Sequence, residues 1–133
     1  MTKIVLKGVF QITTWNESTY AQHHNDSKQT IAEISQTYSG DVSGSAQIRY
    51  IMSYQKEGSA VFVGIEHLTI DTPEIAGSIV LQHNGVFSQG VAQSQFNVIA
   101  DSGTDNLLQY IGHGEFTSTE NGQADYIITL QHE

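Results

Sequence analysis

The sequence contains no cysteine, which excludes disulfide bonds and thiolate chemistry. Basic residues are scarce, since 5 lysine and arginine side chains stand against 14 acidic ones, for a formal net charge of −9. Nucleic acids and anionic membrane surfaces select basic proteins, so we expect neither as a partner. Long apolar runs are also missing, because no stretch approaches the roughly 18 residues that a membrane-spanning helix needs.

The N-terminal segment is too short and too alternating in polarity for a signal peptide, so we expect a cytoplasmic protein. A chain of 133 residues has the length of one domain with its own hydrophobic core. With 12 glycines, 1 proline and many β-branched residues and tyrosines, the composition favours strands and turns over helices. No linker or low-complexity tract divides the chain, so residues 1–133 are expected to form a single domain.

Alternation of apolar and polar residues predicts β-strands along most of the chain. The clearest strands are expected at residues 3–14, 31–39, 45–55, 62–70 and 79–87. Residues 15–30 break the alternation and are interpreted as a long polar loop, and a short helical lid is expected only at residues 105–111. Because hairpins join most of the strands, we predict an all-β fold, an eight-stranded antiparallel meander closed into a barrel without open edges.

Three short segments with glycine in third place predict three-residue hairpin loops, a type I turn followed by a left-handed residue. They are Lys56-Glu57-Gly58, Ser88-Gln89-Gly90 and Glu120-Asn121-Gly122. These loops would pair Tyr50 with Gly64, Ile48 with Glu66, Phe87 with Val91, His83 with Gln95, and Phe116 with Tyr126. Asn84-Gly85 is an alternative two-residue turn.

The two strands between the first and second hairpin loops carry similar residues in opposite order on one face. Folding residues 62–70 back on residues 79–87 would pair Ile70 with Ile79, Leu68 with Leu81, Gly64 with Gly85 and Phe62 with Phe87. The middle rung is Glu66 opposite His83, an ionisable pair within an apolar face. A carboxylate beside an imidazole on a buried face suits general acid–base chemistry, so Glu66 and His83 are the candidate catalytic residues. The same pair can instead be a hydrogen-bonded contact that fixes the strand register.

Five further side chains are candidates for binding a ligand. Tyr50, Tyr54 and Gln95 are expected on the same wall as Glu66, where the alternative role is to fill the core. Trp15 and Glu17 are expected to end the first strand at the barrel rim, either as an aromatic gate with an acid or as a plug.

Metal and cofactor sites are not expected. His23 and His24 are adjacent in the sequence, and adjacent side chains rarely point at one ion. His113 and Glu115 share a strand face, but no second histidine accompanies them in a ligand pattern. Ser102-Gly103-Thr104 lacks the lysine and the length of a phosphate-binding loop.

Several motifs together resemble a small bacterial family of unknown function within the allene oxide cyclase-like barrels. They are Gly8-Val9-Phe10, Trp15-Asn16-Glu17, Tyr38-Ser39-Gly40-Asp41, Gly58-Ser59-Ala60, Phe62-Val63-Gly64, Leu81-Gln82-His83, Ser102-Gly103-Thr104 and Gly112-His113-Gly114. The resemblance covers almost the whole chain and implies an eight-stranded antiparallel barrel with a central cavity. Allene oxide cyclases and dirigent proteins guide the cyclisation or coupling of apolar intermediates, but their catalytic residues have no counterparts that can be mapped here.

The strand face opposite the mirrored residues is also apolar. It carries Val61, Val63, Ile65, Val80 and Val86, although a barrel strand that faces water is usually polar there. We therefore expect a homo-oligomer in which another subunit covers this face.

Three functions are compatible with the sequence. The first is a barrel that binds a small, mostly apolar molecule in its interior. The second is a cofactor-free cyclase or isomerase in which Glu66 and His83 transfer a proton. The third is a structural or interaction module whose barrel is filled by its own side chains.

Overall fold

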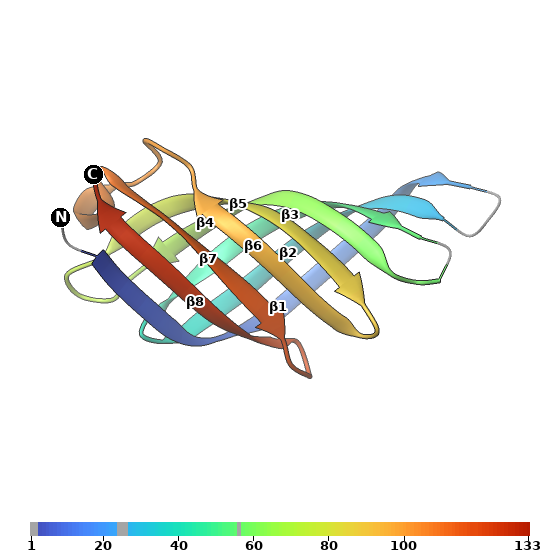
Figure 1. Ribbon diagram of the computed structural model, residues 1–133, viewed down its shortest axis with the longest axis horizontal. Helices are drawn as coiled ribbons and strands as arrows, with labels where there is room; N and C mark the ends of the chain where they lie inside the picture. The colour runs from blue at the N-terminus through green and yellow to red at the C-terminus, as the bar shows by residue number, and fades with distance from the viewer. Residues whose placement is uncertain (1–2, 24–26, 56) are drawn as a thin grey trace.

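The computed structural model describes residues 3–23, 27–55 and 57–133, which form a closed barrel of antiparallel strands (Figure 1). The strands are β1 (Lys3–Gln22), β2 (Lys28–Gly40), β3 (Gly44–Tyr54), β4 (Ala60–Ile70), β5 (Gly77–Ser88), β6 (Val91–Val98), β7 (Tyr110–Ser118) and β8 (Gln123–His132). Each strand pairs with the next one in the sequence, and β8 pairs with β1 to close the sheet. The predicted eight-stranded meander barrel is confirmed.

The helical lid is shorter than predicted. It is a single 3₁₀ turn, η1 (Asp105–Leu107), and β7 already begins at Tyr110. Figure 1 shows η1 at the end of the barrel where the two termini lie. The side chain of Leu107 is completely buried there, so this turn closes that end of the interior.

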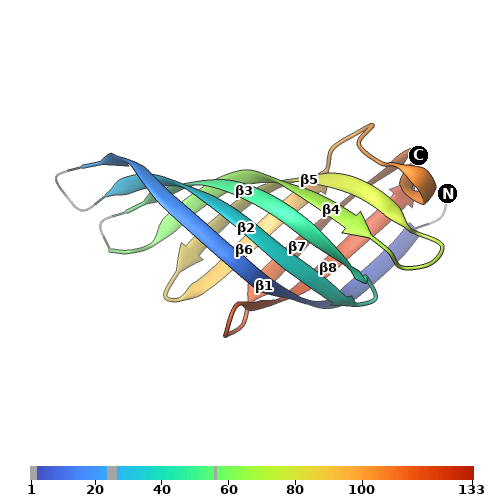
Figure 2. The same ribbon diagram turned by 180° about the vertical axis from the view of Figure 1, so that it is seen from behind.

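The expected polar loop at residues 15–30 is wrong. Strand β1 continues to Gln22 and β2 begins at Lys28, so most of the segment forms a long hairpin. Figure 2 shows this hairpin projecting beyond the other strands at the end opposite the termini. Residues 24–26 of the expected loop lie outside the described residues.

A β-bulge in β1 explains why the sequence pattern was broken there. The register with β2 shifts between Ile12 and Thr14, so one extra residue is inserted into β1. Such an insertion exchanges the faces of the residues that follow it, here as far as a second shift between Thr19 and Ala21. Ile12 therefore lies on the inner face before the bulge, and Trp15 and Glu17 lie on that face after it, opposite Ile34 and Ala32 of β2. Trp15 is still 44% exposed, because it lies at the mouth of the barrel.

The interior divides into two halves that differ in packing. Toward the termini lies the closed half, which is packed with fully buried aliphatic side chains: Leu68, Ile79, Leu81, Leu107 and Leu130. Toward the β5–β6 and β7–β8 turns lies the open half, which is lined by aromatic side chains: Phe10, Trp15, Tyr50, Phe62, Phe87 and Phe116. Buried polar side chains lie between the halves.

The three predicted hairpin loops have different outcomes. The first and third loops give the predicted registers, with Tyr50 opposite Gly64 and Phe116 opposite Tyr126. Lys56 of the first loop lies outside the described residues. The second loop is instead a two-residue turn at Gln89-Gly90, with φ values of 54° and 81° and Ser88 paired with Val91. The alternative turn at Asn84-Gly85 is wrong, because both residues lie within β5.

Within the described residues, no helix has the length and apolar character needed to cross a membrane.

Candidate functional site

Glu66 and His83 contact each other in the middle of the barrel, although they are not directly opposite. The β4–β5 register pairs Glu66 with Leu81 and Gly64 with His83, so the predicted pairing of these strands is wrong by two residues. A shift of two residues keeps every side chain on its predicted face, because the side-chain period of a strand is two. Glu66 and His83 are therefore diagonal neighbours, and Oε1 of Glu66 lies 2.6 Å from Nε2 of His83.

The predicted register of β6 is wrong by one residue. This error has a larger consequence, because a shift of one residue exchanges the inner and outer faces of a strand. Gln95 pairs with Asn84 and points outward, so the expectation that it shares the wall with Glu66 is wrong. Ser94 and Phe96 occupy the interior instead, at 3 % exposure each. Oγ of Ser94 lies 2.8 Å from Nδ1 of His83. The signal for this arrangement is in the sequence, since Ala92, Ser94, Phe96 and Val98 alternate with the more polar Gln93, Gln95 and Asn97.

The other oxygen of Glu66 binds two side chains of β2. The Tyr38 hydroxyl donates a short hydrogen bond to Oε2 of Glu66. Nε2 of Gln36 donates to the Tyr38 oxygen at 3.1 Å and approaches Oε2 of Glu66 at 3.5 Å. Burial, followed by the charge of Glu66, raises the pKa of Tyr38, so its hydroxyl remains a donor.

We call these five side chains the polar layer: Gln36, Tyr38, Glu66, His83 and Ser94. All are buried, and Glu66 has no exposed surface. The two ring nitrogens of His83 face Oε1 of Glu66 and Oγ of Ser94, so a neutral imidazole can donate to one of them and accept from the other. Aromatic rings enclose this histidine, with the centroids of Phe96 and Tyr50 at 4.9 and 5.5 Å. Sequence reasoning found Glu66 and His83 but missed the other partners.

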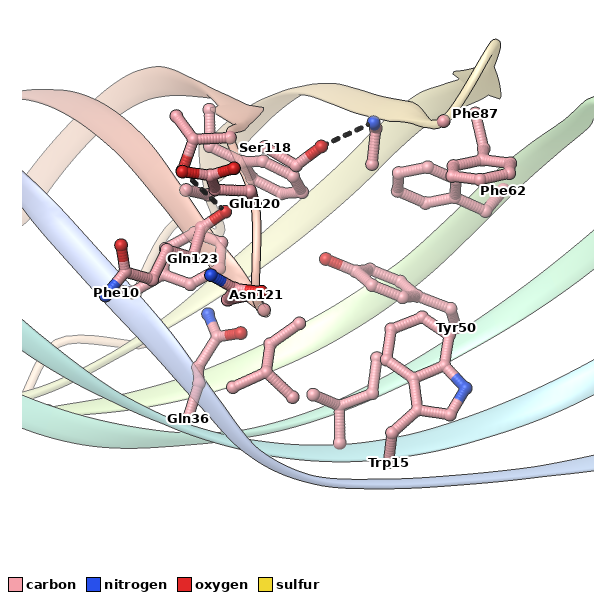
Figure 3. A pocket seen from close by; sticks show the side chains of 18 of the residues that line it. Phe10, Trp15, Gln36, Tyr50, Phe62, Phe87, Ser118, Glu120, Asn121 and Gln123 are labelled. Atoms are coloured by element: carbon pink, nitrogen blue, oxygen red, sulfur yellow. Dashed lines mark hydrogen bonds between the residues drawn. The ribbon is translucent and has the colours of Figure 1, made fainter.

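Beside the polar layer, the open half contains a cavity of about 200 Å³. It opens toward the β5–β6 and β7–β8 turns, where Gly90 and residues 118–124 form its rim. Figure 3 shows Phe10, Tyr50, Phe62 and Trp15 around this space. The predicted positions of Tyr50 in the interior and of Trp15 at a cavity mouth agree with this arrangement.

Strand glycines make room for the rings that shape the cavity. A Cβ atom at Gly64 would lie 2.6 Å from Cδ1 of Tyr50, and one at Gly85 would lie 2.3 Å from Cζ of Phe62. Both distances are far below van der Waals contact, so the two rings lie flat against the neighbouring strands only because these positions lack side chains. The aromatic wall therefore depends on the glycines as well as on the rings.

The polar layer does not open directly into the cavity. Glu66 and His83 are absent from the cavity wall, where Gln36 and Tyr50 take the inner positions. Gln36 contacts Glu66, and the Tyr50 ring packs edge-on against His83. A ligand in the cavity would thus touch the first neighbours of the acid–base pair and not the pair itself.

Glu17 belongs to a separate hydrogen-bonded cluster. It accepts hydrogen bonds from Thr30 at 2.6 Å, Tyr54 at 2.7 Å and the Trp15 indole at 3.0 Å. Burial alone would raise the pKa of Glu17, but these hydrogen bonds and the charge of Lys28 lower it overall. Burial and Glu17 together raise the pKa of Tyr54. Neither Glu17 nor Tyr54 lines the aromatic cavity, since both face a shallower groove beside it.

A family model for proteins of unknown function, DUF3224, matches residues 6–130. The chain belongs to the DUF3224 family. The fold is similar to a crystal structure of a DUF3224 protein of unknown function from Shewanella oneidensis MR-1, with a TM-score of 0.78 and 24% identity over 99% of each chain. No curated protein matches. The prediction of a bacterial family of unknown function is confirmed, and the allene oxide cyclase-like grouping stays a prediction.

Membership of DUF3224, a family of unknown function, assigns no role to the residues of the barrel. The candidate metal ligands of this DUF3224 chain are not brought together. His113 and Glu115 lie exposed on the outside of β7, and His23 contacts Gln29. His24 lies outside the described residues, among which no cluster of three or more metal-ligating side chains occurs.

Proposed function

We propose that the protein binds a small, mostly apolar molecule in the open half of the barrel. The observation that carries this proposal is the aromatic-lined cavity of about 200 Å³. Drug-sized pockets are larger, at about 300–1,000 Å³, whereas an apolar cavity of about 150 Å³ in another protein accommodates benzene. The cavity therefore suits a single ring or a short branched chain.

The contrast with the closed half supports a binding role over a purely structural one. Small eight-stranded barrels can fill their interiors completely, and the closed half does so with aliphatic side chains. The open half retains a cavity because small residues such as Ala92 and Ala124 line part of it. Larger side chains at these positions would remove the space, so the barrel is not uniformly a filled module.

Native mass spectrometry of the protein purified from its source tests the proposal, and a co-purifying small molecule is the expected result. A matched pair of variants then locates the molecule. Ala92→Phe places a ring in the cavity, whereas Val91→Phe places the same ring on the outer face one residue earlier. The molecule should be lost from Ala92→Phe and retained by Val91→Phe. Equal retention by both variants would contradict binding in the interior.

A second candidate function is proton transfer by a cofactor-free cyclase or isomerase. It is favoured by the continuous chain of contacts from Ser94 through His83 and Glu66 to Tyr38. The positions of Glu66 and His83 behind the cavity wall weigh against direct contact with a substrate. Glu66→Gln should leave ligand binding in place while reducing any proton-transfer rate about a hundredfold or more. An unchanged rate in a folded Glu66→Gln protein would rule out this role.

We also propose that a second copy of the chain covers the outside of β2–β5. Apolar side chains with large exposed fractions lie there: Ile31, Ile51, Val61, Val63, Ile65 and Val86. Arg49 and Glu33 lie beside these residues, 76% and 58% exposed and 4.0 Å apart, and form a weak pair. A two-fold interface would let each of them meet the opposite charge on the other copy.

Size-exclusion chromatography with light scattering measures the oligomeric state, and a dimer or larger assembly is expected at micromolar concentration. Val63→Lys places a charge in the centre of the apolar face and should shift the protein toward monomer. Thr117→Lys, on the outside of β7, is the matched control. A wild-type monomer would refute this interface. The cytoplasmic location and the expectations concerning cofactors, nucleic acids and membranes stay predictions.

A further inference from the structure

Two polar side chains each direct one unpaired oxygen atom into the apolar cavity. Tyr50 and Gln36 are 6% and 4% exposed, and Figure 3 shows both directed toward the interior of the pocket. Nε2 of Gln36 is used by Tyr38 and Glu66, whereas Oε1 of Gln36 and Oη of Tyr50 have no hydrogen-bond partner among the described residues. No fully buried polar side-chain atom of those residues lacks a partner, so both oxygens face the cavity.

These two atoms define the polar group that would satisfy them. Burial and then the charge of Glu66 raise the pKa of Tyr50, so its hydroxyl keeps its proton and can donate. Oε1 of Gln36 can only accept. A single ligand group that satisfies both must accept from Tyr50 and donate to Gln36. A hydroxyl group does so, whereas a ketone or ether only accepts and an ammonium group only donates.

Charge and volume restrict the rest of the ligand. Glu66 lies 3.5 Å behind Gln36, and Glu120 lies on the rim of the cavity. A chain of net charge −9 with these carboxyl groups near the cavity disfavours an anion. The volume of about 200 Å³ leaves space for one ring between the aromatic walls.

We propose that the cavity recognises a neutral, ring-sized molecule through one hydroxyl group, which accepts a hydrogen bond from Tyr50 and donates one to Gln36. This inference rests on the proposed function, because it names the ligand class of the same cavity. Apolar walls provide the affinity, and the two polar atoms orient the molecule with its hydroxyl toward the polar layer.

Titrations followed by ligand-observed NMR test this proposal with phenol, toluene and benzoate as probes. The wild-type protein should bind phenol at least about tenfold more tightly than benzoate. Tyr50→Phe removes one oxygen and should weaken phenol binding about tenfold while leaving toluene binding unchanged. Tyr54→Phe makes the same chemical change outside the cavity and should alter neither affinity.

The outcomes separate the two proposals. If phenol and toluene bind but Tyr50→Phe weakens neither or both alike, recognition of a hydroxyl is overturned and interior binding stands. Benzoate binding as tightly as phenol overturns the neutrality of the ligand, and this measurement uses only the wild-type protein. If neither phenol nor toluene binds the wild-type protein, the proposed function itself fails.

Discussion

The two halves of the barrel are built from the same strands but packed by different rules. In the closed half, aliphatic side chains from facing strands leave Leu68, Ile79 and Leu130 without exposed surface. In the open half, rings and alanines line a cavity of about 200 Å³. The buried core therefore extends through both halves, but only the open half leaves space between its side chains.

The polar layer between the halves explains how both can coexist. It supplies a hydrogen-bonded partition across the barrel, with Glu66 at its centre and Gln36 toward the cavity, where the Tyr50 ring packs against it. Because every fully buried polar side-chain atom in the described part of the chain has a partner, the partition does not destabilise the interior through unmet hydrogen bonds. The contribution of the polar layer to stability can therefore be tested separately from the proposed binding in the cavity.

The largest effect is expected when the polar layer is broken. Glu66→Leu leaves His83 and Tyr38 without their acceptor and should lower the free energy of unfolding by about 3–5 kcal/mol. Urea denaturation measures this change. The double variant Glu66→Leu/His83→Leu removes both partners and should recover part of the loss. A double variant less stable than the single one would show that the pair is not the main contact.

Truncation in the closed half should be the next largest effect. Leu68→Ala removes a fully buried side chain from close packing and should cost about 3 kcal/mol. Ile34→Ala, at 3 % exposure beside the existing cavity, should cost less, at about 2 kcal/mol. Thermal and urea unfolding of the two variants compare them, and equal losses would refute the difference in packing.

Substitutions that enlarge a side chain, in place of truncating it, should also distinguish the two halves. Ala46→Leu adds atoms to the filled half and should destabilise the fold by about 1–3 kcal/mol. Ala124→Leu adds the same atoms to the cavity wall and should be close to neutral for stability while it weakens probe binding. A stability loss as large for Ala124→Leu as for Ala46→Leu would indicate that the open half is also tightly packed.

The smallest effect concerns Glu17 at the edge of the open half. Its pKa is lowered in the folded protein, so ionised Glu17 stabilises the fold above the pKa of the unfolded chain, about 4.5. This contribution is lost as the pH falls through the folded-state pKa. Glu17→Gln should therefore cost about 1 kcal/mol at pH 7 and progressively less below pH 4.5, as measured by unfolding at several pH values. A difference that is independent of pH would contradict the role of the charge.

The sequence predicted the fold better than the site because a barrel depends on alternation and a site depends on register. Loop length decides register, and the second hairpin shows how an error of one residue in loop length changes the predicted site. A two-residue turn at Gln89-Gly90 instead of three residues exchanged Gln95 for Ser94 and Phe96 in the interior. The two-residue error between β4 and β5 was harmless by comparison, because it preserved the faces and left Glu66 beside His83.

Other features of the site could not be inferred from alternation at all. The bulge after Ile12 inverts the pattern in β1, so Trp15 and Glu17 were expected at a strand end although the strand continues past them. Gln36 and Tyr38 were not predicted as partners of Glu66, because their contacts with it cross from β2 to β4 over the barrel interior. Contacts between non-adjacent strands depend on barrel closure, which no local pattern specifies.

The burial of His83 gives the protein an internal spectroscopic reporter. A proton on Nε2 would lie between the imidazole and Glu66, shielded from water, so we expect it to exchange slowly with solvent and to give a resolved NMR signal far downfield. The Tyr50 ring lies edge-on to the same imidazole at 5.5 Å and also lines the cavity. Any molecule that displaces this ring would shift the signal, so occupancy of the cavity could be followed without labelling the ligand.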